Sequence, residues 1–257
     1  MSKKKAVFNK LLGGGIDVDS FVISVKTDNT GTSNNDQFGL YFTTAGSPTT
    51  LFDVDWGDGN SDLAQTGNIV HTYASAGTYT VTLTGESGSF LSSDSGENQK
   101  IIDIINWGFY QWNLAFTFRG MNMTGNWSAI DAPNLSNVTD MATAFANNPQ
   151  NADFSGWDLT NILGLTNCFF NNDSFRGDGL DTWDLTNATT ISMLTASTGL
   201  STANYDALLL AWDALGVYAY SGNVNFGGSK YTSGGAVETA RTNLIAKWGS
   251  ITDGGAV

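Results

Sequence analysis

The fold is decided by three stretches of sequence that align without gaps: APNLSNVTDMATAF (132–145), GWDLTNILGLTNCF (156–169) and TWDLTNATTISMLT (182–195). Asn137, Asn161 and Asn187 recur at spacings of 24 and 26 residues, each two positions after a leucine. An asparagine at such a position can hydrogen-bond its own backbone in a bend. A period of about 25 residues with a fixed leucine and asparagine is typical of a solenoid, whose copies bury their apolar faces against one another.

The three copies predict one internal row made of Leu135, Leu159 and Leu185. The third copy ends on Thr195 where the first two end on phenylalanine, so we expect the stack to stop there. Because fewer than three full copies cannot cover a core by themselves, the flanking segments must cap both ends.

The segment that follows, 196–257, is predicted to be a small α/β cap. After Ser201 or Thr202 as N-cap, one helical face holds Tyr205, Leu208, Leu209, Trp212 and Leu215. A second face, ending at Gly249, holds Val237, Ala240, Leu244, Ile245 and Trp248. Both sets have the spacing of an amphipathic helix, and a strand is expected between them at 217–226.

The segment before the repeats, 16–95, is predicted to be a β-sandwich. Short β-branched and aromatic runs alternate there with clusters of Asn, Asp, Gly and Ser: FVISVKT (21–27), FGLYFTT (38–44), LFDVDW (51–56) and YTVTLTG (79–85). That spacing of strands and turns is typical of a small sandwich. The polar, Gly- and Ser-rich stretch 85–100 predicts a boundary before the repeats at 101–195.

The composition supports a mainly β, multi-domain protein. Among 257 residues there are 30 Gly, and only Glu86, Glu97 and Glu238 of the 24 acidic residues are Glu. Asp, Asn and Gly favour turns rather than helix interiors, which excludes a helical bundle. A net charge of −13 repels phosphate backbones and argues against nucleic-acid binding.

The first 15 residues are predicted to form an arm that binds a partner. They combine basic and apolar side chains before the Gly13–Gly15 hinge: Lys3, Lys4, Lys5, Val7, Phe8, Lys10, Leu11 and Leu12. Such a segment can insert an apolar face into a groove while its lysines meet carboxylates at the rim. A solvated tail is the alternative.

Two families resemble parts of this chain. FDVDWGDGN (52–60) followed by HTYASAGTYTVTLTG (71–85) resembles the polycystic-kidney-disease (PKD) type immunoglobulin-like domain, which implies a spacer or adhesive sandwich without catalysis. IIDIINWG (101–108), DAPNLSNVTDM (131–141) and the two WDLTN boxes resemble BspA-like leucine-rich repeats. The tail is similar to the closing segment of such repeats, which occur in secreted adhesins and in bacteriophage proteins. The expected solenoid is therefore of the leucine-rich-repeat type.

The acidic residues of the WGDG turn suggest a calcium-binding loop, but their spacing argues against one. Asp53, Asp55 and Asp58 are close together. An EF-hand loop needs Asp or Asn at its fifth position and Glu at its twelfth, and these positions hold Gly57 and Ala64. A hairpin turn explains the same residues. His71, the single histidine, lacks a nucleophile motif, and we expect it to bond a neighbouring turn.

The single cysteine and a set of five tryptophans are best explained as core residues. Cys168 is the single cysteine, which excludes an intrachain disulfide and predicts a small buried apolar residue. Five tryptophans could form an exposed carbohydrate-stacking stripe or a core row, and the core is favoured: Trp107, Trp112, Trp127, Trp157 and Trp183. No cofactor or metal site is predicted.

No catalytic constellation is visible, so we predict a protein that is not an enzyme. The sequence has no transmembrane run and its start is too broken for a signal-peptide core, which predicts assembly in a host cytoplasm. Adhesin-like segments without a secretion signal favour a structural protein of a bacteriophage virion. Such a protein would be a head decoration, a fibre or a tail component. We expect it to be a homo-oligomer bound to other virion proteins, with host glycans as possible ligands and no membrane partner. A bacterial surface adhesin is the alternative, and a polysaccharide-degrading accessory protein a third.

Overall fold

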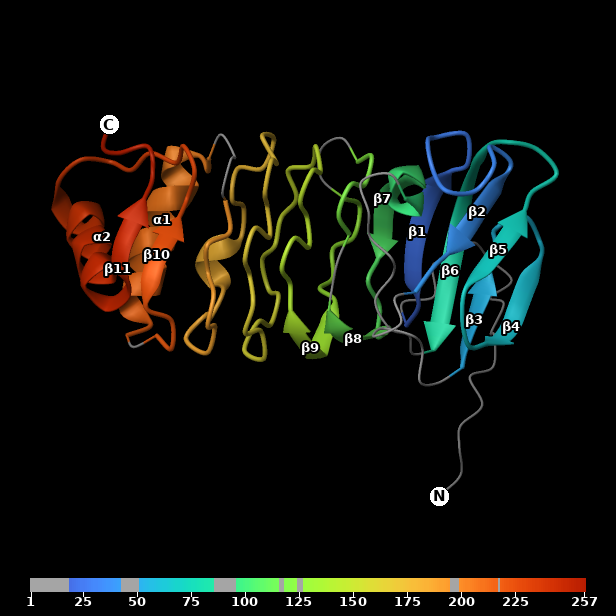
Figure 1. Ribbon diagram of the computed structural model, residues 1–257, viewed down its shortest axis with the longest axis horizontal. Coiled ribbons are helices and arrows are strands. Elements are labelled where there is room, and N and C mark those ends of the chain that lie inside the picture. Colours follow the sequence, from blue (N-terminus) through green and yellow to red (C-terminus); the bar gives the residue numbers. More distant parts are fainter. Residues whose placement is uncertain are drawn as a thin grey trace, which may run out of the picture.

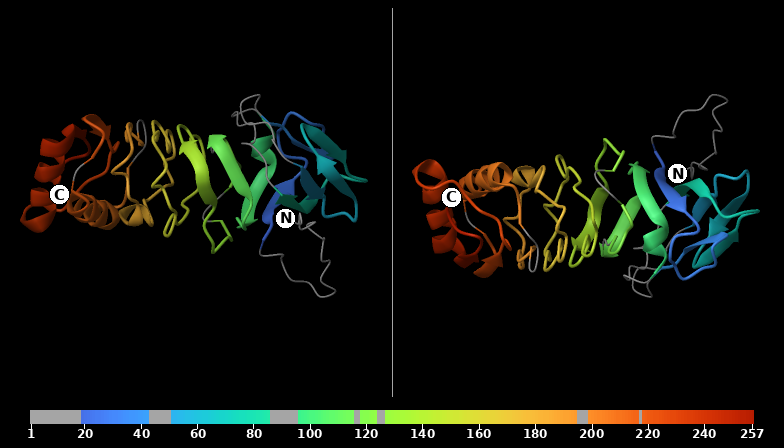
Figure 2. Two further views of the ribbon diagram at one scale, coloured as in Figure 1. Left: turned by 90° about the horizontal axis from the view of Figure 1, so that it is seen from below. Right: turned by 90° about the horizontal axis from the view of Figure 1, so that it is seen from above.

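The computed structural model describes residues 19–42, 51–85, 96–115, 118–123, 127–194, 199–216 and 218–257. It is mainly β, with a large antiparallel sheet and two α-helices among these residues. From β7 onward, segments follow one another along the long axis in sequence order, and the helices lie at the end opposite the strand-rich part (Figures 1 and 2). The predicted arm, 1–15, lies outside the described residues.

The strand-rich end contains two sheets. A five-stranded sheet in the order β4-β3-β6-β1-β7 faces a two-stranded sheet, β2-β5. Their bounds are β1 Phe21–Lys26, β2 Gln37–Leu40, β3 Phe52–Asp55, β4 Ser61–Gln65, β5 Ile69–Thr72, β6 Thr78–Gly85 and β7 Ile101–Asn106. The four predicted strand runs all contain strands. β4 and β5 were not predicted, because their side chains are mostly exposed or half-buried and lack an apolar run.

β7 joins this sheet to the next part of the chain. It pairs antiparallel with β1, with Ile23 opposite Ile104, although the sequence placed residue 101 at the start of the repeats. One continuous apolar core extends from Phe21 to Trp248. The domain boundaries stay predictions. At the boundary expected at 85–100, strands from both sides, β1 and β7, belong to one sheet.

Beyond β7 the chain forms stacked turns that run side by side (Figure 1). β8 (Gln111–Ala115) pairs in parallel with β9 (Asn134–Asp140), and single parallel bridges link Asp140 to Gly164 and Gly164 to Thr190. Backbone hydrogen bonds continue between turns, as from Phe145 N–H to the Cys168 carbonyl (2.8 Å). The prediction that Leu135, Leu159 and Leu185 are buried is confirmed.

The recurring asparagines bond to the preceding turn, which corrects one detail of the prediction. The side-chain amide of Asn161 donates to the carbonyl of Ser136 (3.1 Å), and that of Asn187 donates to the carbonyl of Thr160 (3.1 Å). The local bend is instead held by Asp158, whose carboxylate accepts from the backbone and hydroxyl of Thr160. The asparagine row therefore ties neighbouring turns together.

The helical end closes the stack. After the single turn of 3₁₀ helix η2 (Leu180–Thr182) come α1 (Thr202–Ala214), β10 (Gly222–Asn225), α2 (Gly235–Trp248) and β11 (Gly249–Thr252). The Ser201 hydroxyl accepts from Asn204 N–H, which confirms the predicted N-cap. The Trp212 indole donates to the Leu180 carbonyl (3.1 Å) and so anchors α1 to the last turn. Leu215, predicted on the buried face, is exposed because α1 ends before it.

Candidate functional site

A densely hydrogen-bonded polar cluster lies where the sandwich meets the stacked turns. Its centre is Lys100, at the end of the 3₁₀ helix η1 (Glu97–Lys100), with a fully buried side chain. Its ammonium donates to the carbonyls of Ser33 (3.1 Å), Asn34 (2.8 Å) and Gln37 (2.8 Å), and to the Ser33 hydroxyl (2.8 Å). The lysine thus occupies a cage of backbone oxygens, as a bound cation would.

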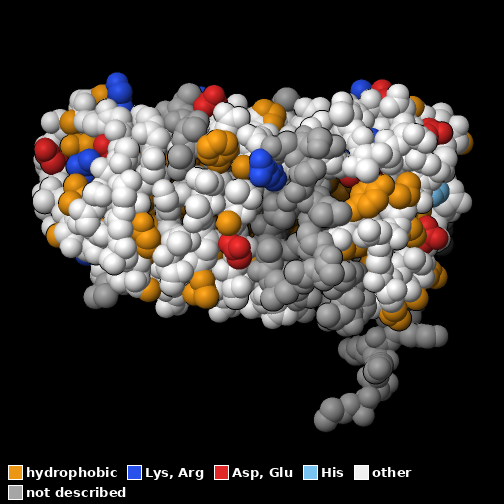
Figure 3. Space-filling view, in the orientation of Figure 1, with side chains coloured by type: hydrophobic (Ala, Val, Ile, Leu, Met, Phe, Trp, Pro, Cys, Tyr) orange, Lys and Arg blue, Asp and Glu red, His pale blue; other side chains and the backbone are white. Residues whose placement is uncertain are grey.

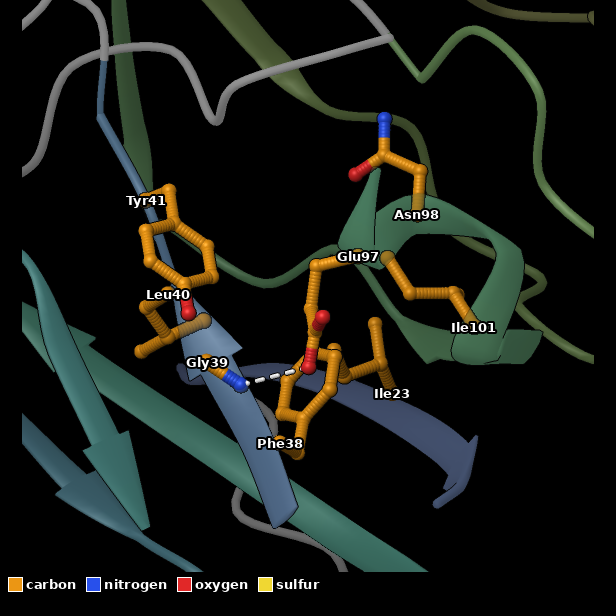
Figure 4. A pocket seen from close by; sticks show the side chains of 8 residues that line it. All are labelled: Ile23, Phe38, Gly39, Leu40, Tyr41, Glu97, Asn98 and Ile101. Atoms are coloured by element: carbon orange, nitrogen blue, oxygen red, sulfur yellow. Dashed lines mark hydrogen bonds between the residues drawn. The ribbon is translucent and has the colours of Figure 1, made fainter. Parts of the chain in front are cut away.

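Glu97, one helical turn earlier, completes this clamp. Its carboxylate accepts from the backbone N–H groups of Thr32 (2.9 Å), Ser33 (3.0 Å) and Gly39 (2.9 Å), and from the Ser33 hydroxyl. The Lys100 ammonium is 3.6 Å away. Figure 4 shows the Glu97 side chain reaching β2 at Gly39. We call Glu97, Lys100 and Ser33 the junction clamp.

The clamp encloses too little space for a ligand. The cavity beside Glu97, lined by Phe38, Tyr41 and Ile101, measures about 10 Å³, which is room for about one water molecule. Burial lowers the pKa of Lys100, and the charge and hydrogen bond of Glu97 oppose that shift. The arrangement suits holding two segments together rather than chemistry on a substrate.

η1 contacts both sides of the junction. The Asn29 side-chain amide donates to the Gln99 carbonyl (3.2 Å) on the sandwich side. On the other side, the Asn98 amide donates to the Arg119 carbonyl (3.1 Å) in the first stacked turns. The sequence analysis assigned Glu97 and Lys100 to a polar boundary and missed the clamp. The available signal was a Glu–x–x–Lys spacing immediately before an apolar strand.

The WGDG turn forms a hairpin whose carboxylates are used by the turn itself. Asp55 accepts from Gly57 N–H (2.9 Å) and Asp58 from Asn60 N–H (3.0 Å). Among the described residues no group of three or more His, Cys, Asp or Glu side chains could hold a metal ion. The hairpin interpretation of this turn is confirmed.

His71 bonds this turn, as predicted. Its Nε2 lies 2.9 Å from the Asp58 carboxylate, and its ring stacks on Trp56 with centroids 5.0 Å apart. The Trp56 indole in turn donates to Asp62 (2.8 Å). His71 therefore ties β5 to the turn between β3 and β4.

Acid should weaken this end of the sandwich through Asp58. Burial alone would raise the Asp58 pKa, but hydrogen bonds from His71 and Asn60 and the charge of His71 lower it below its usual value. A lowered pKa stabilises the fold above about pH 4 and loses that effect as the pH falls through the folded-state pKa. We expect Asp58→Asn to flatten the thermal midpoint's pH dependence between about pH 3 and 5. An unchanged profile would contradict this role.

The other residues singled out by sequence lie in the core. Cys168 is fully buried, and burial raises the pKa of its thiol. The five tryptophans are at most 5% exposed, which confirms the core row and overturns the carbohydrate-stacking alternative. The arm residues Lys3, Lys4, Lys5, Val7, Phe8, Lys10, Leu11 and Leu12 lie outside the described residues, so their predicted role stays a prediction.

A second hollow lies beside the junction clamp. It has a volume of about 340 Å³ and is lined by Gln99, Gly120, Met121, Asn122, Asn147 and Pro149. We call it the junction groove. It is within the size range of small-molecule sites.

Comparison with known proteins identifies two regions. Residues 22–100, which include Lys100 but not β7, match the family model of the PKD domain, so this segment is a PKD domain. Residues 112–223 match a family described as Mycoplasma protein of unknown function, DUF285. This second match is compatible with the BspA-like resemblance, while leucine-rich repeats stay a prediction. No curated protein and no solved structure matches the chain. No helix among the described residues has the length and apolar character needed to span a membrane.

Proposed function

We propose that this chain is a non-catalytic structural protein that acts as a rigid rod between its PKD domain and its helical end. The observation that carries the proposal is the junction: β7 pairs with β1, and Lys100 is buried in carbonyl oxygens beside it. Domains joined by flexible linkers share few contacts. A shared sheet and a buried ion pair instead resist bending at this point.

We infer that the stacked turns form a short solenoid of the leucine-rich-repeat type. The buried leucine row, the parallel bridges and the asparagine bonds between turns all support this proposal. Backbone hydrogen bonds join each turn to the next, from Met141 N–H to the Gly164 carbonyl (2.8 Å) and from Leu165 N–H to the Thr190 carbonyl (3.0 Å), as in repeat proteins. The solenoid would form the shaft of the rod, closed at one end by the PKD domain and at the other by the α/β cap.

Small-angle X-ray scattering tests the rod. We expect the scattering of the full chain to fit one rigid arrangement of the described residues. As a control, a Gly–Ser sequence replaces Glu97–Lys100, which removes the clamp and gives a flexible connection. That control should show a broader distribution of dimensions. If the native chain scatters like the control, the rigid rod is wrong.

The rod would serve as a surface component of a bacteriophage particle, a head decoration, fibre or tail part that displays adhesive modules. The PKD domain resembles a spacer, and the chain has a net charge of −13, which disfavours association between copies. Mass spectrometry of purified particles from the phage or host that encodes the chain tests this role. Recovery with host cell envelopes instead would favour a surface adhesin.

The arm is expected to anchor the rod. Deletion of residues 2–12 should abolish co-sedimentation with particles, because the apolar side chains that enter a partner groove and the lysines at its rim are lost together. A variant with Lys3, Lys4 and Lys5 changed to Ser keeps the apolar side chains and should show salt-sensitive, partial retention. Full retention of the deletion variant would contradict an anchoring role.

A further inference from the structure

We propose that the junction groove binds a neutral ligand carrying several hydroxyl groups, of the size and chemistry of a hexose. This goes beyond the structural role, which needs no ligand. The groove exists only in the joined chain. Gln99 comes from η1 at the end of the PKD domain, and Asn122 and Asn147 come from two different stacked turns.

The polar lining consists of carboxamides. Gln99 and Asn122 make no side-chain hydrogen bond to the rest of the described chain, so their amides are free to bind. Asn147 is held in place, because its side-chain oxygen accepts from the Asn171 amide (2.9 Å). A carboxamide offers a donor pair and an acceptor on one plane, which matches adjacent hydroxyls that both donate and accept.

The lining carries no charge, which decides between ligand classes. None of its six residues is acidic or basic, although the chain has 24 acidic residues. Charged side chains are also sparse on the face seen in Figure 3. Without a lysine, arginine or carboxylate to pair with, an anion or a cation would lose hydration without compensation. A neutral polar ligand avoids that cost.

The three other lining residues, Gly120, Met121 and Pro149, carry no carboxamide. Gly120 has no side chain to fill the space, Met121 is only 1% exposed, and Pro149 is exposed beside them. A sugar ring presents C–H groups on one face and hydroxyls around its edge. The exposed Pro149 ring suits the first, and the carboxamides suit the second.

A buried polar group next to the groove also lacks a partner. Gln150 follows Pro149 and is fully buried, and neither amide atom of its side chain has a hydrogen-bond partner among the described residues. Such groups are rare in folded proteins and call for an explanation such as a bound water or ligand.

The test is a titration of the full chain followed by NMR. D-Glucose, D-galactose and N-acetyl-D-glucosamine are added separately, and the Met121 methyl and Asn147 amide signals are followed. A ligand of this size should bind with a dissociation constant of about 1 mM. D-Glucuronate and D-glucosamine, which carry a charge, should bind at least about tenfold more weakly. Methyl glycosides of the same sugars are titrated as well. If they bind as tightly as the free sugars, the groove accepts the end of a glycan, whose anomeric oxygen is substituted; if they bind more weakly, it accepts a free sugar.

Variants locate the site. Gln99→Ala combined with Asn122→Ala should weaken sugar binding about tenfold or more, with an unchanged melting midpoint. Gln65→Ala is the matched control, because Gln65 lies outside the groove lining and its side-chain amide donates to the nearby carbonyl of Leu63 (2.8 Å). This control should bind sugar as the native chain does. No signal change with any of the three sugars, equal binding of the charged sugars, or unchanged binding by the double variant would each overturn the proposal. None of these outcomes affects the scattering test of the rod.

Discussion

Lys100→Met should destabilise the protein by about 3–5 kcal/mol, because it removes one member of a buried ion pair and leaves the other without compensation. The methionine keeps the length and apolar stem of the lysine but donates no hydrogen bond. The carbonyls of Ser33, Asn34 and Gln37 would lose their shared donor, and Glu97 its nearby cation. Unfolding in denaturant, followed by tryptophan fluorescence, measures the loss.

Lys26→Met is the matched control for this prediction. Lys26 pairs with Asp28 at 3.3 Å, but both side chains are more than 40% exposed. Exposed ion pairs contribute little, so this substitution should change stability by at most about 1 kcal/mol. Equal effects of the two substitutions would show that the junction clamp contributes no more than a surface ion pair.

Phe169→Ala alone should lower the free energy of unfolding by about 3–5 kcal/mol. Phe169 is fully buried and stacks on Phe145 (centroids 5.9 Å apart) and on Phe175 (4.1 Å). Its removal leaves a cavity between neighbouring turns that the hydrogen-bonded backbone cannot close. A chemical denaturation curve of the variant tests the stacked arrangement directly.

Phe109→Ala provides the comparison for Phe169. Phe109 is 74% exposed, so the same chemical change removes little buried surface and should shift stability by about 0.5 kcal/mol or less. If Phe169→Ala were as mild as Phe109→Ala, the apolar ladder between turns would not carry the stability of the stack.

Local patterns determined much of this protein. The helix-spaced apolar residues and Ser201 predicted α1 and its cap, because these depend on neighbours within one or two turns of the chain. The same holds for the hairpin at Asp58. The buried leucine row was predicted for a different reason, since its recurrence at a nearly fixed period is visible in the sequence alone. PKD membership of residues 22–100 was also evident from the WGDG turn and the strand after it.

Only the tertiary structure decided the junction. Lys100 meets carbonyls more than 60 positions earlier in the chain, and no periodicity marks a backbone oxygen as a partner. The pairing of β7 with β1, the asparagine bonds between turns and the junction groove likewise join segments distant in sequence. A sequence records which side chains can be buried or can bend the chain. Which distant backbone groups they meet is set by how the sheets and turns pack, since hydrogen bonds to the backbone leave no residue-specific signature at the accepting position.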